Sequence, residues 1–190
     1  MALAREGAAH FAIDAAASLL TVQAFASGIV AVIAHSPKFA MRDMSGEIRF
    51  NRDAMENSSV RTSIRLGSLE IMDEVSTMDR REIERVMFDE VLEKSRYPTA
   101  DFRSSRVAAT KISESVYRAQ IAGDLNLHGV TRGLTFESQV VVGEDTLRAQ
   151  GAFSLTQTDF GLKIASIANG ALKLKDELKF GFFLVARRKE

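Results

Sequence analysis

Long stretches of this chain alternate apolar and polar residues one by one, and this pattern constrains the fold more than any other feature of the sequence. Around residue 125, the apolar Leu125 and Leu127 alternate with the polar Asp124, Asn126 and His128. Because successive side chains of a β-strand point to opposite faces, such a segment buries one face and leaves the other in water. The sequence therefore predicts half-buried strands.

The alternation recurs along most of the chain. After Gly129, which permits a tight turn, a second alternating segment begins near Thr131 and continues through Leu134 and Phe136 to Val142. Similar runs occupy residues 46–51, 60–66, 100–104, 116–123, 146–156 and 177–186. Short polar links join most of them, which predicts an antiparallel meander. A sheet of about eight strands must cover or close its edges, so we expect it to curl into a barrel.

One segment, residues 76–94, has the period of a helix. Its apolar residues recur at four-residue spacing and form a single stripe, namely Ile83, Met87 and Val91. Ser76, followed three residues later by Asp79, resembles a capping box. We expect this to be the main helix, and a shorter apolar helix over residues 28–35. The many charges of the main helix are explained best by a solvated face of mixed sign rather than by a catalytic or metal site.

Composition limits the classes of protein to which the chain can belong. Its 190 residues can bury one core, and no repeat, low-complexity tract or linker divides them, so we expect a single domain over residues 1–190. Lys plus Arg and Asp plus Glu are 25 each, so no excess positive charge indicates a nucleic-acid partner. The chain has no cysteine, which rules out disulfides and thiolate metal sites. No cofactor or metal is predicted.

The N-terminal region bears on where in the cell the protein is expected. The first residues carry charges without an apolar stretch and a cleavage site of small residues, so the default expectation is cytoplasmic. Residues 15–34 carry no charge and approach the length that spans a bilayer. Because this stretch contains Thr21, Gln23 and Gly28 and runs into the turn-like segment 35–37, we expect no stable membrane span.

Few residues are candidates for catalysis or for binding a polar group. His35 follows an apolar segment and precedes a turn, where an imidazole could bind a head group or shuttle a proton, although a structural capping role explains it better. Arg42 and Lys163, each beside aromatic residues, are candidates to hold an anionic head group at a barrel mouth. No phosphate-binding glycine loop, nucleophile elbow or metal-ligand pair is present, and this counts against the familiar enzyme classes.

Several segments together resemble a known family. In chain order they are FAID at 11–14, SGEIRF at 45–50, RYPTADFRS at 96–104, GDLNLHGVT at 123–131, DFGL at 159–162 and KDEL at 175–178. This order resembles the YceI-like family, whose members are similar to lipocalins in shape and are associated with binding polyisoprenoids and related lipids. The resemblance implies a mainly β fold: an antiparallel up-and-down, lipocalin-like β-barrel with one main α-helix, a short apolar helix near the entrance and a long apolar cavity.

We therefore expect a binding protein, a carrier or store for an apolar small molecule such as a polyisoprenoid or a fatty acid, and not an enzyme; a homodimer is compatible with this expectation. The expected ligand-binding residues are Phe25, Ile29, His35, Phe39, Arg42, Leu125, Leu127, Phe136, Phe153, Leu155, Phe160, Lys163, Phe180 and Phe182. One alternative is an enzyme or stress-response accessory acting on a small apolar substrate, with His35 as acid or base and Asp159 or Arg42 orienting it. Another is a structural domain with a solid interior.

Overall fold

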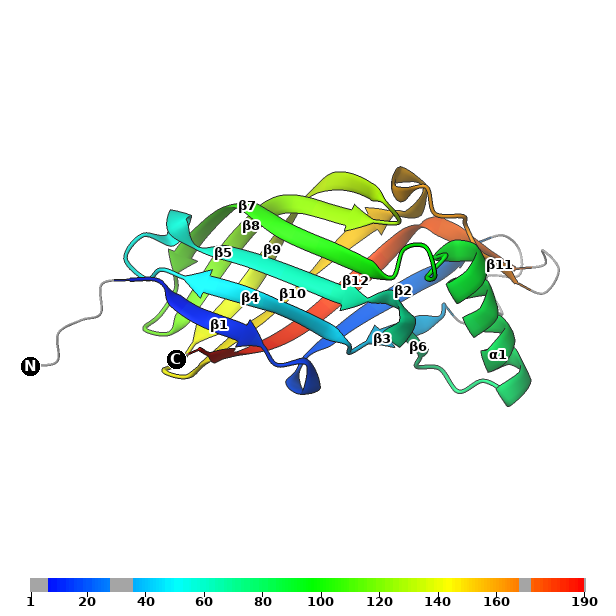
Figure 1. The fold of residues 1–190 in the computed structure, drawn as a ribbon, viewed down its shortest axis with the longest axis horizontal. Helices are drawn as coiled ribbons and strands as arrows, with labels where there is room; N and C mark the ends of the chain where they lie inside the picture. Colours follow the sequence, from blue (N-terminus) through cyan, green and yellow to red (C-terminus); the bar gives the residue numbers. More distant parts are fainter. Residues whose placement is uncertain (1–6, 28–35, 168–171, 190) are drawn as a thin grey trace, which may run out of the picture.

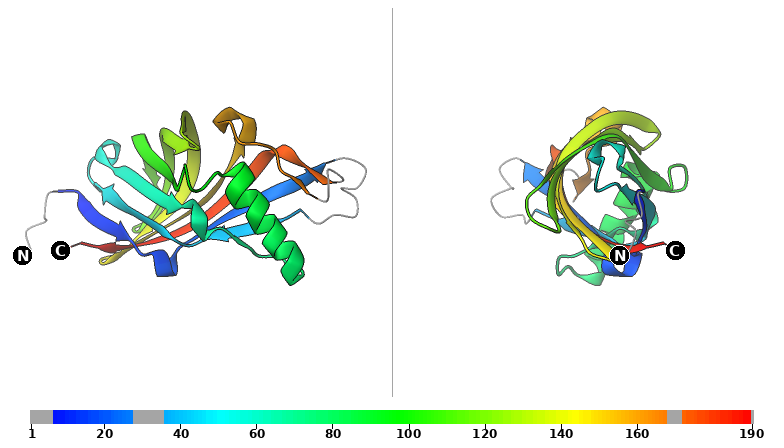
Figure 2. Two further views of the ribbon diagram at one scale, coloured as in Figure 1. Left: turned by 45° about the vertical axis from the view of Figure 1, so that its right-hand side comes forward. Right: turned by 90° about the vertical axis from the view of Figure 1, so that its left-hand side faces the viewer.

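The computed structural model describes residues 7–27, 36–167 and 172–189. They form an elongated antiparallel barrel (Figure 1). The first strand and the end of the last strand lie at one end of the barrel, and the main helix lies across the other end (Figures 1 and 2). The expectation of a mainly β barrel with one main helix is confirmed.

The strands account for most of the described chain. They are β1 (Ala9–Ile13), β2 (Leu19–Ser27), β3 (Lys38–Met41), β4 (Met44–Phe50), β5 (Ser59–Arg65), β6 (Glu70–Ile71), β7 (Thr99–Lys111), β8 (Val116–Leu127), β9 (Val130–Val142), β10 (Thr146–Thr156), β11 (Ser166–Ile167) and β12 (Leu172–Arg188). Short helical turns are η1 (Ala15–Ala17), η3 (Met55–Asn57), η4 (Leu66–Ser68) and η6 (Gln157–Phe160). The main helix is α1 (Thr77–Arg85), which continues as the π-helical turn η5 (Val86–Val91).

Eight of the described strands close into a ring, in the order β1, β4, β5, β7, β8, β9, β10, β12 and back to β1. Figure 2 shows this ring viewed along the barrel. A barrel of this strand number has an interior that side chains can fill or that can hold one small ligand. The predicted turn between β8 and β9 is confirmed: His128 and Gly129 both have positive φ, 54° and 75°, as a two-residue type I′ hairpin requires.

The long strand β12 joins two parts of the sheet. One edge pairs with β10, while the other pairs with β1 near the C-terminal end of β12 and with β2 along its earlier part. From β2 the sheet continues through β3 to β6 at the helix end of the barrel (Figure 1). Part of the uncharged stretch 15–34 is thus the strand β2, whereas the apolar helix expected at 28–35 lies outside the described residues. Within the described ranges, no helix has the length and apolar character that crossing a membrane requires.

The main helix forms where the sequence predicts it. Ser76 is the N-cap, and its hydroxyl oxygen accepts a hydrogen bond from the backbone N–H of Asp79 at 3.1 Å. The exposed face is charged, and Arg85 pairs there with Glu82 and Glu90. The apolar stripe is buried mainly in the η5 turn, which brings the helix against the end of the barrel.

Candidate functional site

The interior of the barrel contains two adjoining chambers. The chamber far from the helix, here the distal chamber, has about 140 Å³ open to the centre of a water molecule, and the proximal chamber beneath η5 has about 90 Å³. On this measure about 10–15 Å³ holds one water molecule, so both are large. Four residues line both chambers, namely Leu20, Ile64, Leu125 and Phe153. The barrel is therefore hollow along its axis rather than packed solid.

The distal chamber has an almost entirely apolar wall. It is lined by inward-facing residues of β8, β9, β10 and β12, among them Ala119, Val140, Ala149 and Leu184. A buried cluster lies at this end of the barrel, and its least exposed members are Phe11, Tyr117, Leu147 and Ala186, each at most 1% exposed. Since most of the wall is apolar, a molecule in the distal chamber would lie in a largely apolar environment.

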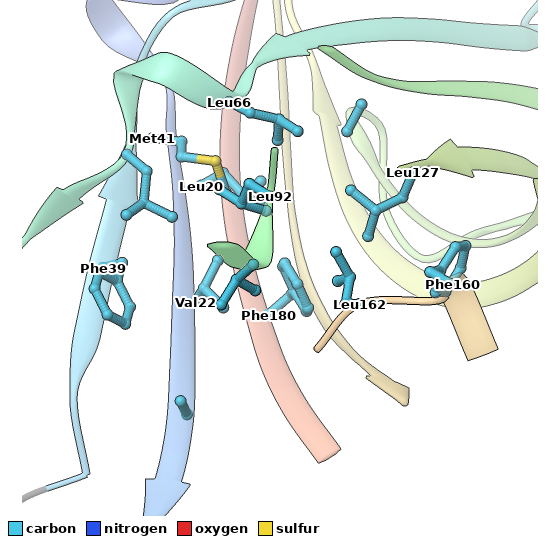
Figure 3. Close-up of a cluster of buried hydrophobic side chains, with 14 of the residues drawn as sticks. Leu20, Val22, Phe39, Met41, Leu66, Leu92, Leu127, Phe160, Leu162 and Phe180 are labelled. Carbon is cyan, nitrogen blue, oxygen red and sulfur yellow. The ribbon is translucent and has the colours of Figure 1, made fainter. Parts of the chain in front are cut away.

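The proximal chamber lies between the strands and the end of the helix. Figure 3 shows side chains from several elements converging here, including Leu20 and Val22 from β2, Phe39 from β3 and Leu92 just after η5. Among the described lining residues, Gln157 is the polar one. Its amide nitrogen donates to the carbonyl oxygen of Lys175 at 2.9 Å, which fixes the side chain at the wall.

Five phenylalanines lie where the chambers meet. Phe136 is the centre of this group, with its ring centroid 5.5 Å from those of Phe102, Phe153 and Phe182. Phe153 also stacks on Phe180 at 5.0 Å with nearly parallel planes. Offset and edge-to-face contacts of this kind add to the stabilisation from buried area. The rings give the junction a broad apolar surface.

Most of the predicted lining residues are in the chamber walls. They are Phe39, Leu125, Leu127, Phe136, Phe153, Leu155, Phe180 and Phe182. They come from five strands: β8, β9, β10 and β12 belong to the closed ring, and β3 belongs to the part of the sheet that continues from β12 through β2.

Four other predicted residues lie away from the chamber walls. Phe25 is on the opposite face of β2 from Val22 and Ala24, beside the exposed Lys179, because side chains alternate along a strand. Phe160 is buried in the core next to the proximal chamber but does not line it, since its η6 turn lies beyond the end of β10.

The two predicted cations are also outside the walls. Arg42 and Lys163 lie in connections rather than strands, and their side chains are exposed to solvent. Neither lines a chamber. Ile29 and His35, which complete the predicted set, lie outside the described residues.

Sequence reasoning missed several lining residues that the same alternation contains. Tyr117, Ala119 and Ile121 on β8 are in phase with the predicted Leu125 and Leu127, so extending the pattern toward the start of the strand would have identified them. The contribution of β2 was missed as well, because apolar residues on both faces of this strand hide its alternation.

The ionisable groups with shifted pKa values lie outside both chambers. The hydrogen bond from Arg187 to Asp14 lowers the pKa of that carboxyl, and hydrogen bonds from Thr158 lower the pKa of Asp176. Asp159, considered as an orienting residue, is exposed, and its backbone oxygen accepts from Arg132. Within the described part of the chain, no three His, Asp or Glu side chains form a group able to hold a metal ion.

Comparisons with known proteins agree with this architecture. BcnA of Burkholderia cenocepacia superposes with a TM-score of 0.70 at 19% identity, covering 91% of this chain and 98% of BcnA. A polyisoprenoid binding domain from Saccharophagus degradans gives a TM-score of 0.71 at 16% identity, covering 96% of this chain and 99% of that domain. The YceI protein of Campylobacter jejuni gives 0.59 at 16% identity, covering 80% of this chain and 85% of that protein.

At these identities the structural matches show a common fold. No curated protein sequence matches the chain. The sequence profile of the YceI-like domain matches residues 11–186, nearly the whole of the barrel, and this confirms the resemblance seen in the sequence. The chain belongs to the family of YceI-like domains.

Proposed function

We propose that this protein is a carrier or store for one apolar, isoprenoid- or fatty-acid-like molecule, which it binds inside the barrel. The observation that carries the proposal is the pair of adjoining apolar chambers along the barrel axis. The Saccharophagus degradans neighbour is described as a polyisoprenoid binding domain, and this supports the same ligand class for the present chain.

The composition of the walls favours affinity through burial of the ligand. Removing apolar area from water contributes about 25 cal/mol per Å², and a wall with few polar groups adds little directional specificity. The proximal wall is apolar apart from Gln157, and the distal wall has only a few hydroxyl groups and the exposed Arg49 among apolar residues. Such a binding site accepts a flexible hydrocarbon chain of variable shape.

The same walls favour binding over catalysis. General acid–base chemistry needs a titratable side chain within hydrogen-bond reach of the substrate. Among the described residues, no His, Asp or Glu lines either chamber. An apolar substrate held in these chambers would therefore lie away from the acidic side chains described here.

Native purification tests the proposal directly. We expect organic extraction of the purified protein to release a long-chain lipid, and native mass spectrometry to show one bound molecule per barrel. Protein that carries no lipid and also takes up none from added isoprenoids or fatty acids would contradict the proposal.

A matched pair of variants on β10 tests the location of the ligand. Ala149 is buried in the wall of the distal chamber, whereas Ala152, three residues later, is exposed. Ala149→Leu places three extra carbons in the chamber and should weaken ligand binding by about tenfold or more, because the ligand loses buried area. Ala152→Leu should bind as the wild type does. Isothermal titration calorimetry measures both, and equal affinities for the two variants would place the ligand elsewhere.

A further inference from the structure

Tyr117 carries a buried hydroxyl group in the otherwise largely apolar wall of the distal chamber. It lies on β8, in the inward-facing row that continues through Ala119 and Ile121, and it contributes to the chamber wall. The side chain is fully buried, with 0% exposure. Its hydroxyl is the buried side-chain polar atom that has no hydrogen-bond partner among the described residues.

The ring of Tyr117 is held firmly by its neighbours. Phe50 meets it edge-on with the ring centroids 5.1 Å apart, and both belong to the buried cluster at this end of the barrel. Phenylalanine would satisfy the same packing. A buried hydroxyl without a partner lowers the stability of the folded state, and such groups are rare in native structures. The hydroxyl therefore needs an explanation other than packing.

The surroundings restrict the chemistry of its partner. Polar wall residues of this chamber already have partners: the hydroxyl of Ser138 donates to the carbonyl oxygen of Gln150 at 3.1 Å, and the hydroxyl oxygen of Ser58 accepts from the backbone N–H of Asn51 at 3.0 Å. Among the described wall residues, the only cationic one is Arg49, and it is exposed to solvent. A charged group buried beside Tyr117 would lack a buried counter-charge, and this is strongly unfavourable. An uncharged oxygen meets no such penalty.

We propose that the hydroxyl of Tyr117 hydrogen-bonds an uncharged oxygen of the bound ligand, either an alcohol or a carbonyl. The oxygen-bearing end of the ligand then occupies the distal chamber, and its hydrocarbon part extends past the phenylalanine junction into the proximal chamber. This inference rests on the proposed function, and it makes Tyr117 the residue that selects an oxygenated lipid over a plain hydrocarbon.

Two probes of similar shape test the inference: the isoprenoid alcohol farnesol and the isoprenoid hydrocarbon farnesene. Tyr117→Phe removes only the hydroxyl. We expect it to weaken farnesol binding by about threefold to tenfold, the range for one net hydrogen bond, while leaving farnesene binding unchanged. The ligand-free Tyr117→Phe protein should be at least as stable as the wild type, because it buries no unpaired hydroxyl.

The chain offers a matched control. It has two tyrosines and no tryptophan, and the other tyrosine, Tyr97, lines neither chamber. Tyr97→Phe should bind both probes as the wild type does. It also leaves Tyr117 as the single tyrosine, so the near-ultraviolet difference spectrum of this variant on adding farnesol reports on the phenol of Tyr117. A change with farnesol and a smaller one with farnesene are expected.

A third variant, Gln157→Met, decides which chamber receives the oxygen, because Gln157 is the polar residue of the proximal wall. We expect it to leave the preference for farnesol intact. The inference is overturned if Tyr117→Phe weakens both probes equally or neither, or if the selective loss appears in Gln157→Met instead. If the wild type binds neither probe nor any other lipid, the proposed function fails, and the inference fails with it.

Discussion

At the scale of single residues, the aromatic junction depends on glycines that make room for the rings. Gly151 on β10 is paired across the sheet with Phe182 on β12, and both face the interior. A Cβ atom at Gly151 would lie 2.4 Å from the carbonyl oxygen of Glu137 and 2.7 Å from the ring of Phe182. Both distances are far below van der Waals contact, so either the strand or the ring would have to move.

Gly151→Ala should therefore destabilise the protein by about 1–3 kcal/mol, the usual cost of overpacking a well-ordered interior. Gly133 on β9 is the matched control, because a Cβ atom there meets nothing within 4 Å. Gly133→Ala should change the free energy of unfolding by less than about 0.5 kcal/mol. Urea denaturation followed by circular dichroism measures both free energies of unfolding. Equal changes in the two variants would show that the neighbours of Gly151 can move aside without lowering stability.

At the scale of elements, one polar contact connects the end of the helix to the barrel. Glu93, just after η5, lies with its carboxylate 2.8 Å from Nε2 of His128 in the β8–β9 turn. The ring of Tyr97 stacks against His128 with a centroid distance of 4.3 Å. The His128 side chain is only 12% exposed, so this contact is better shielded from water than the ion pairs of the helix surface. It holds the helix over the proximal chamber.

Replacing His128 tests this link. The residue has a left-handed backbone conformation, with φ of 54°, which asparagine also tolerates. His128→Asn should therefore keep the turn and lose the contact with Glu93, lowering stability by about 1 kcal/mol. We expect faster hydrogen exchange of the amides in α1 and η5 and faster release of a bound lipid. His10→Asn, at an exposed position on β1, is the control, and unchanged exchange in His128→Asn would show that packing alone holds the helix.

Elements whose two faces differ in polarity were predictable from the sequence. The strand at 146–156 and the helix starting after Ser76 were located closely, since each has a regular apolar stripe. β2 was missed as a strand because Leu19 and Phe25 make its outer face partly apolar and hide the alternation. β7 was predicted only over residues 100–104, because its bulge near Ser104 shifts the phase.

The candidate site, like the fold, was predictable from the sequence only in part. Most of the predicted residues that lie in the chamber walls come from the inward rows of β8, β9, β10 and β12. Sequence alone could not assign the phase of β2, so Phe25 was placed inside. It also could not show which cations lie near the chambers, because the position of connecting residues such as Arg42 depends on how the whole barrel closes.

At the scale of the whole molecule, two ion pairs connect the early strands to the last one. Asp14, just after β1, pairs with Arg187 on β12 at 2.7 Å, and Glu47 on β4 pairs with Lys189 just after β12. Both pairs lie along the seam where β12 returns to β1 and completes the ring. They are solvent-accessible, so each is expected to contribute modestly and to weaken with salt.

Because of these two ion pairs, we expect acid to weaken the seam between β12 and β1. The hydrogen bond from Arg187 lowers the pKa of Asp14 below its usual 3.8, and the hydrogen bond from Lys189 lowers the pKa of Glu47 below its usual 4.5. A carboxyl whose pKa is lower in the folded state binds fewer protons there than in the unfolded chain. Its stabilising contribution is therefore complete above the usual pKa and is lost as the pH falls through the folded-state pKa.

The double variant Asp14→Asn, Glu47→Gln should consequently lose less stability than the wild type between about pH 5 and pH 3, because the two titrations are absent. Thermal unfolding midpoints measured across this range at low salt give the two slopes, and added sodium chloride should bring them together. Glu56→Gln, an exposed position on the η3 turn, should keep the wild-type slope. If the double variant has the wild-type slope as well, carboxyls elsewhere control the acid response, and hydrogen bonding between β1 and β12 closes the ring without help from these charges.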